Sequence, residues 1–97
     1  MQQQHWTTSS AIVVPPRRSD VCERNVDGEA LLYDPCNGNL CRLNETALVV
    51  WRACDGQASA HDIARQLVDS FEVEFDTALD HVDQLVAMFA KTDLLEG

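Results

Sequence analysis

The sequence predicts an α+β domain in which a three-stranded antiparallel sheet precedes three helices. Three observations support this fold class. Two turn signals separate β-like segments in the first half of the chain, capping residues open helical segments in the second half, and apolar residues then recur at helical spacing. The length of 97 residues suits one domain with a modest core.

Three short segments have the pattern of strands: residues 17–23, 29–34 and 39–43. Asp27-Gly28 favours a tight turn between the first two, because both residues tolerate positive φ. Pro35-Cys36-Asn37-Gly38 favours a second turn. Two hairpins in series make a meander, and its third strand has a free edge unless another segment covers it.

The first helix is expected to begin at Asn44, a preferred N-cap, with Glu45 favourable at the positive end of the helix dipole. Gly56, after Asp55, can adopt the left-handed conformation that ends a helix. The apolar face comprises Ala47, Val50, Trp51 and Cys54. We expect Trp51 to be a core residue, because a tryptophan at apolar helical spacing usually packs inside.

Two further helices follow. Ser59 is expected to cap the second helix, with Asp62 in the position of a capping-box acid. Asp76 is expected to cap the third. The second helix has Ile63, Ala64, Leu67, Val68 and Phe71 on its apolar face, and the third has Ala78, Leu79, Val82, Leu85, Val86 and Phe89.

Residues 1–16 are expected to form a flexible tail, because they are rich in Gln, Ser and Thr and end in Pro15-Pro16. The alternative is that Ile12-Val13-Val14 docks on the sheet or swaps into a neighbouring subunit. The chain has no secretory signal pattern and no apolar run near the roughly 20 residues of a membrane span. We therefore expect a cytoplasmic protein with reduced thiols and no membrane contact.

Charge is distributed unevenly. Residues 1–54 carry five arginines against six acids, whereas residues 55–97 carry one Arg and one Lys against ten acids. An acidic half repels phosphate backbones, so no nucleic-acid partner is expected. A winged-helix DNA-binding or regulatory protein is the alternative function, but its reading helix would carry Asp76, Asp80 and Asp83 and no cation before Lys91.

No arrangement typical of an enzyme or a metal site is found. The cysteines Cys22, Cys36, Cys41 and Cys54 include no C-x-x-C pair, so neither a metal nor a cofactor is expected. A Cys36–Cys41 disulfide across the hairpin is an alternative to four ordinary thiols, two of them buried. The histidines are scattered at positions 5, 61 and 81, and the acids of the third helix have the pattern of a solvated face.

Several of these features together resemble the PqqD-like family. They are Leu43-Asn44-Glu45-Thr46-Ala47, then Trp51, then Asp55-Gly56, followed by "DIARQL" at 62–67 and "FEVEFDTALDHVDQLV" at 71–86. The resemblance covers about residues 17–96. Members of the PqqD-like family include the small peptide chaperone of pyrroloquinoline quinone biosynthesis and the recognition domains of enzymes that modify ribosomally made peptides.

The resemblance implies a winged helix-turn-helix-like fold over residues 17–97 that binds no DNA and catalyses no reaction. A leader peptide is expected to pair with the third strand as an added strand, with the third helix as the other wall of a groove. The partners are then a precursor peptide and a modifying enzyme, with a radical SAM enzyme as one candidate, and a homodimer through the edge strand or the tail is left open. The expected peptide-binding residues are Asn39, Leu40, Cys41, Arg42, Leu43, His81, Val82, Asp83 and Val86, with Val82 and Val86 alternatively in the core.

Overall fold

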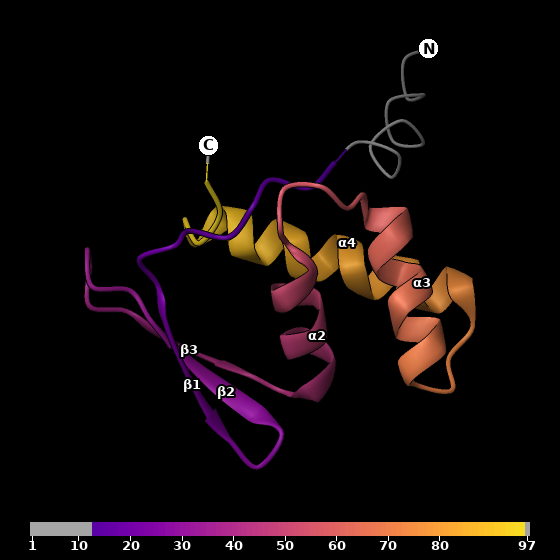
Figure 1. Cartoon of the computed structure of the whole chain (residues 1–97), viewed down its shortest axis with the longest axis horizontal. Coiled ribbons are helices and arrows are strands. Elements are labelled where there is room, and N and C mark those ends of the chain that lie inside the picture. Colours follow the sequence, from indigo (N-terminus) through magenta and orange to yellow (C-terminus); the bar gives the residue numbers. More distant parts are fainter. Residues whose placement is uncertain (1–12, 97) are drawn as a thin grey trace.

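The computed structural model describes residues 13–96 and has the predicted α+β architecture (Figure 1). A three-stranded antiparallel sheet with the order β1-β2-β3 is followed by three helices. The elements are β1 (Cys22–Val26), β2 (Glu29–Tyr33), β3 (Leu40–Leu43), α2 (Glu45–Ala53), α3 (Ala60–Ser70) and α4 (Phe75–Lys91). Among residues 13–96, no helix is both long enough and apolar enough to cross a membrane.

The turn between β1 and β2 fixes which backbone groups of the sheet are free. Asp27 and Gly28 have φ of 52° and 81°, so they form the expected two-residue turn, and Val26 pairs with Glu29. Bonded and non-bonded pairs alternate along an antiparallel ladder. Odd-numbered β2 residues therefore bond to β1, and even-numbered residues bond to β3.

The same alternation determines the outer edge of β3. Asp34 donates its N–H to the Asn39 carbonyl at 3.0 Å, and the register places Leu32 opposite Cys41 and Ala30 opposite Leu43. Asn39, Cys41 and Leu43 therefore face β2 with their backbone polar groups. It follows that the N–H and C=O groups of the residues between them, Leu40 and Arg42, point to the free edge.

The core lies between the inner face of the sheet and the three helices. Trp51 of α2 is 2% exposed and contacts Phe89 of α4 edge to face, with ring centroids 5.3 Å apart. The prediction that Trp51 is a core residue is confirmed. Other fully buried side chains come from each layer: Leu32, Leu43, Val50, Ile63, Leu67 and Val82.

Side-chain caps fix two of the three helix starts. The Asn44 Oδ1 accepts the N–H of Ala47 at 2.9 Å, and Ser59 and Asp62 form a reciprocal capping box, both as predicted. The expected cap at Asp76 is wrong. Glu74 occupies the N-cap position of α4 without a side-chain hydrogen bond, and Asp76 lies within the first turn.

Residues 13–18 cross the helical layer opposite the sheet and form what we call the strap. Val14 is 5% exposed and donates its N–H to Ala58, while Arg17 donates its N–H to Cys54. The strap passes beside the C-terminal segment (Figure 1), where the N–H of Glu96 bonds to Pro16.

The strap corrects two predictions. Residues 13–16 are packed against the folded domain, so the expectation of a flexible tail does not hold for these four residues. Residues 1–12 lie outside the described residues, and their flexibility stays a prediction. The expected strand over 17–23 is also wrong, because Arg17 and Arg18 bond to Cys54 and Leu94 and the first strand is Cys22–Val26.

Candidate functional site

A groove of about 460 Å³ lies between the end of β3, the first turn of α2 and one face of α4. Backbone or side-chain atoms of nine residues line it: Arg42, Leu43, Asn44, Thr46, Ala47, His81, Gln84, Leu85 and Met88. Leu43 and Ala47 are buried, Leu85 and Met88 are half-buried, and His81 and Gln84 are exposed. The groove therefore has an apolar floor and a polar rim.

Helical geometry explains why these α4 residues share one wall. His81, Gln84, Leu85 and Met88 are separated by steps of three, one and three residues, which places them on one face of the helix. At a rise of 1.5 Å per residue this wall is about 10 Å long. An extended peptide advances about 3.3 Å per residue, so the wall matches about three residues of a strand.

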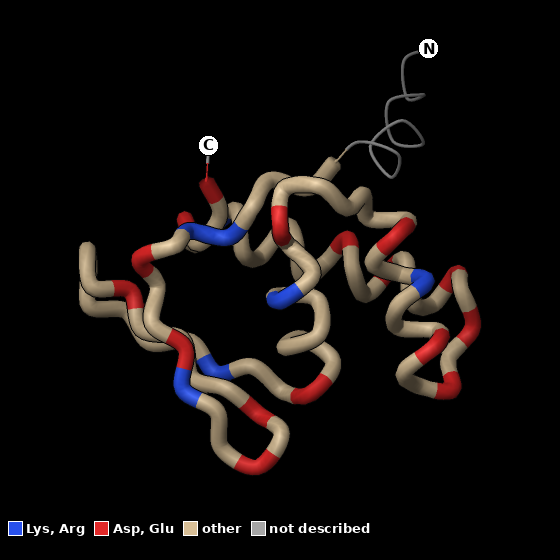
Figure 2. The backbone as a smooth tube through the Cα atoms, in the orientation of Figure 1, with Lys and Arg blue, Asp and Glu red and all other residues tan. Residues whose placement is uncertain are grey.

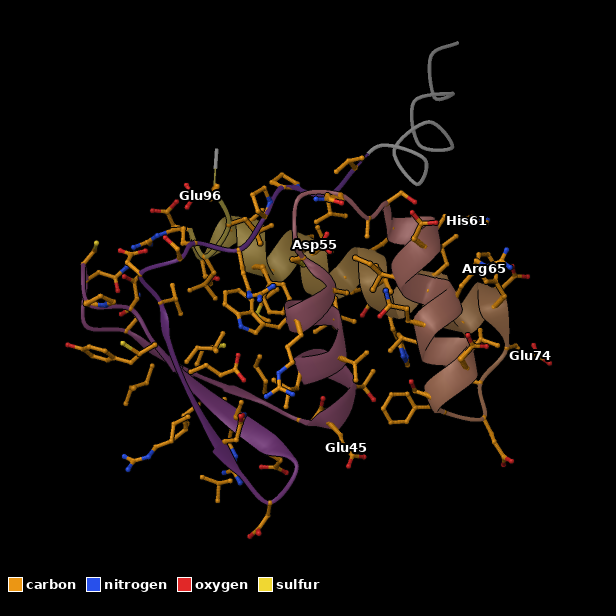
Figure 3. The ribbon with its side chains drawn as sticks, in the orientation of Figure 1. Glu45, Asp55, His61, Arg65, Glu74 and Glu96 are labelled. Carbon is orange, nitrogen blue, oxygen red and sulfur yellow. The ribbon has the colours of Figure 1, made fainter. Side chains whose placement is uncertain are left out.

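The N-cap of α2 joins the edge strand to the groove. β3 ends at Leu43, Asn44 caps α2, and Thr46 follows in its first turn, so consecutive segments of the chain form one wall. Glu45, labelled in Figure 3, lies in this first turn, and its carboxylate lies beside Gly28 of the β1–β2 turn. The cap bond fixes the direction in which the chain leaves the sheet, so it also fixes this wall.

The structure brings part of the predicted site together. Arg42, Leu43 and His81 line the groove. The remaining β3 predictions, Asn39, Leu40 and Cys41, lie in or next to the same edge strand, where Leu40 is 68% exposed.

Three predicted residues of α4 lie elsewhere. Val82 is 0% exposed, so its proposed contact with a peptide is wrong and the alternative core assignment is correct. Val86 is half-buried against the core, and Asp83 is exposed, but neither lines the groove. Helical rotation accounts for this, because Val82 and Val86 continue the buried face of the helix rather than the face toward β3.

Six lining residues were not predicted: Asn44, Thr46, Ala47, Gln84, Leu85 and Met88. A signal for half of them exists in the sequence. Gln84, Leu85 and Met88 continue the helical face of His81 at i+3, i+4 and i+7, so choosing His81 as a wall residue implied them. Asn44, Thr46 and Ala47 had no such signal, since their place in the groove depends on how α2 packs against α4.

The charged side chains near the groove, Arg42 and Asp83, are exposed to solvent. Arg42 donates to Glu29 Oε1 from Nε at 3.1 Å and from Nη2 at 2.9 Å, across the strand pair. The Arg42 side chain is 77% exposed, so this ion pair contributes little and can be exchanged for another acid. On α4, partial burial and the nearby Asp80 raise the pKa of the Asp83 carboxyl.

A second polar cluster lies at the β2–β3 hairpin, away from the groove. The Arg18 guanidinium donates to both carboxylate oxygens of buried Asp34, at 2.9 and 3.1 Å, and also to Asp20. Asp20, Asp34 and Cys36 have ligand atoms within 4.8 Å of one another, a spacing compatible with a metal ion. The Arg18 guanidinium already pairs with both carboxylates, so we interpret this cluster as a structural ion-pair network.

Arg18 also determines the ionisation of this cluster. Its hydrogen bonds hold the pKa of Asp34 below the ordinary value, despite the opposing effect of burial. A hydrogen bond to Asp20, together with burial, raises the pKa of the Cys36 thiol. The four cysteines are free thiols, of which Cys54 is buried and Cys41 half-buried.

Comparison with protein-family models identifies the family of this chain. The family model described as coenzyme PQQ synthesis protein D (PqqD) matches residues 29–95, which include β2, β3 and all three helices. The chain belongs to the PqqD family. The predicted resemblance is thereby confirmed, and the groove between β3 and α4 lies wholly within the matched residues.

Two solved structures have the same fold as this PqqD-family chain. One is TbiB1 in complex with the TbiA(beta) leader peptide, with a TM-score of 0.74 and 18% identity over 84% of this chain and 95% of that one. The other is lasso peptide synthetase B1 complexed with the leader peptide, with a TM-score of 0.74 and 23% identity over 87% and 99% of the two chains. No curated protein matches the chain.

Proposed function

We propose that this chain is a non-catalytic recognition module that binds the leader segment of a ribosomally made precursor peptide and presents it to a modifying enzyme. The observation that carries the proposal is the free edge of β3 beside an apolar groove of about 460 Å³. Family membership supports it, as do two structural neighbours that are themselves complexes with leader peptides.

The edge and the groove supply different parts of the binding energy. Backbone groups of Leu40 and Arg42 can bond to an added strand, which gives affinity for almost any extended peptide. Alternate side chains of that strand would then face the groove, where Leu85 and Met88 offer apolar contacts. A short segment must offset its own ordering cost, so we expect a micromolar complex, on the order of −8 kcal/mol.

We assign the groove residues of β3 and His81 to peptide contact and place the module in the cytoplasm, where its free thiols stay reduced. Presentation requires a second partner, and a radical SAM enzyme is our candidate from the family resemblance. Self-association through the same free edge would compete with the peptide. Sedimentation at increasing protein concentration, with and without peptide, tests that competition.

DNA binding is the disfavoured alternative. A reading helix needs cations, but α4 carries exposed Asp76, Asp80 and Asp83. Figure 2 shows acidic residues along α3 and the loop before α4, while most basic residues lie on the sheet and the strap. A gel shift on genomic and random duplexes at low salt would contradict our proposal if it detected tight, specific complexes.

The decisive experiment replaces one backbone group at the edge. Leu40→Pro removes an N–H that points away from β2, so the sheet keeps its ladder bonds while the free edge loses a donor. Leu40→Ala is the matched control, since it shortens the same side chain and keeps the N–H. The probe is a fluorescently labelled 15-residue peptide selected for binding to the parent protein from a random displayed library, titrated by fluorescence anisotropy.

We expect Leu40→Pro to weaken binding at least about 10-fold relative to Leu40→Ala, because it removes a hydrogen bond and distorts the strand. Circular dichroism establishes that each variant is folded. Equal affinities of the two folded variants for the peptide would show that the β3 edge is not the binding site.

A further inference from the structure

A second, smaller cavity adjoins the groove and has no role in the function proposed above. Its volume is about 120 Å³, and we call it the side pocket. Five residues line it: Thr46, Leu67, Phe71, Val73 and His81. Thr46 and His81 also line the groove, so these two residues form the boundary between the cavities.

The side pocket is apolar. Leu67 is 1% exposed, and Phe71 and Val73 are half-buried at the C-terminal end of α3 and in the loop that follows. Glu74 lies at the end of this loop, and its side chain points away from the body of the protein (Figure 3). The other acid of the loop, Glu72, lies between Phe71 and Val73 and is also exposed, so the pocket presents hydrocarbon with the Thr46 hydroxyl and the His81 ring at its rim.

The volume limits the occupant. An engineered apolar cavity of about 150 Å³ in another protein binds one benzene molecule. A cavity of about 120 Å³ therefore fits a branched or linear aliphatic side chain, whereas an indole is too large. Because the walls are apolar, a charged or amide side chain would lose its hydration there without gaining partners.

The course of the chain leads a bound peptide to this pocket. Leu43, Asn44 and Thr46 succeed one another along the groove wall, away from the β3 edge. A peptide that is paired with β3 and runs toward α2 therefore reaches Thr46 and His81. One side chain at that point can enter the side pocket while its neighbours stay in the groove.

We propose that the side pocket is an anchor site for one aliphatic side chain, Val, Ile, Leu or Met, of the peptide that occupies the groove. The proposal rests on the peptide-binding function proposed above. The groove and edge accept many extended sequences, and the side pocket then selects among them by the size and polarity of one residue.

A displayed library of random 15-residue peptides tests the proposal without knowledge of the natural precursor. The parent protein, Leu40→Pro and Val73→Phe each select from the same library. Val73→Phe fills the pocket, and Val68→Phe is the matched control, because Val68 lies on the exposed side of α3 and lines neither cavity. Phe71→Leu, which enlarges the pocket, is a second pocket variant should Val73→Phe fail to fold.

We call a peptide edge-dependent if the parent enriches it and Leu40→Pro does not. The edge-dependent peptides are expected to share an aliphatic residue at one position. That preference should disappear with Val73→Phe, widen to aromatic residues with Phe71→Leu, and persist with Val68→Phe. In a selected peptide, replacing the anchor residue by Ala should weaken binding to the parent by about 10- to 50-fold and binding to Val73→Phe by less than about 3-fold.

Two other outcomes separate failure of this proposal from failure of the proposed function. Edge-dependent peptides whose preferences are unchanged by both pocket variants would overturn the anchor site and leave the peptide-binding function standing. Enrichment that is identical for the parent and Leu40→Pro would overturn strand addition, and the anchor proposal would be rejected with it.

Discussion

Replacing Asn44 tests whether one side chain holds the junction between the edge strand and α2. Its Oδ1 accepts the N–H of Ala47 at 2.9 Å, and its backbone carbonyl accepts the N–H of Leu48 at 2.9 Å. Asn44→Ala removes only the first bond and leaves an N–H of the first helical turn without its partner. The loss of such a cap typically costs about 1 kcal/mol.

For a domain of this size, 1 kcal/mol corresponds to a fall in Tm of about 4–8 °C. Thermal and urea unfolding followed by circular dichroism measure both quantities. Asn44→Asp keeps a cap acceptor, so its stability should stay within about 0.5 kcal/mol of the parent. Asn39→Ala, at the other end of β3, is the matched control, because the Asn39 side chain is exposed and caps no helix.

The reasoning would be refuted if Asn44→Ala and Asn39→Ala unfolded at the same temperature. The Asn44 side chain would then contribute no more to the free energy of unfolding than a solvated side chain does. The observed cap bond would not stabilise the protein. A loss shared equally by Asn44→Ala and Asn44→Asp would point instead to a packing role of the amide group.

Three further outcomes are expected. Hydrogen bonds from Arg18 hold the folded-state pKa of Asp34 below its ordinary value of 3.8, so the stabilisation is complete above that pH and is lost as the pH falls through the lowered pKa. The gap in urea midpoint between the parent and Asp34→Asn should therefore be largest above pH 3.8 and should narrow as the pH falls below it. Burial raises the pKa of Cys54 to about 11, so Cys54 should react with a thiol reagent only on unfolding, whereas exposed Cys22 should react at once. Phe89→Ala should destabilise the protein by about 3–5 kcal/mol through the cavity left beside Trp51, measured by urea unfolding with tryptophan fluorescence.

Local chemistry made much of the fold predictable. The Asp27-Gly28 turn, the Asn44 cap and the Ser59–Asp62 capping box depend on residues adjacent in sequence, and each forms as expected. β1 was misplaced because all five of its residues are exposed, so it carries no alternation between buried and exposed positions. Its register is set instead by the turn, which pairs Val26 with Glu29.

The site was harder to predict than the fold. The order of the hairpins makes β3 an edge strand, so the position of the candidate site at this edge could be predicted from the sequence. Which side chains of α4 face that edge depends on the rotation of the helix about its axis, which tertiary packing decides. Val82 and His81 are neighbours in sequence, yet one is buried in the core and the other lines the groove. Burial of Val14, which is part of the strap, likewise depends on the distant loop that contains Ala58.

The strap also sets an order in which the molecule can be completed during synthesis. The Arg17 guanidinium bonds to the carbonyl of Cys54, 37 residues later, and that of Arg18 bonds to the carbonyl of Asp93, 75 residues later. During synthesis the residues of the hairpins and α2 are added before Asp93. Contacts of such large sequence separation carry a high cost of loop closure. We therefore expect the hairpins and α2 to form first, and the strap to close over the helices only after α4 and the segment that follows it are available.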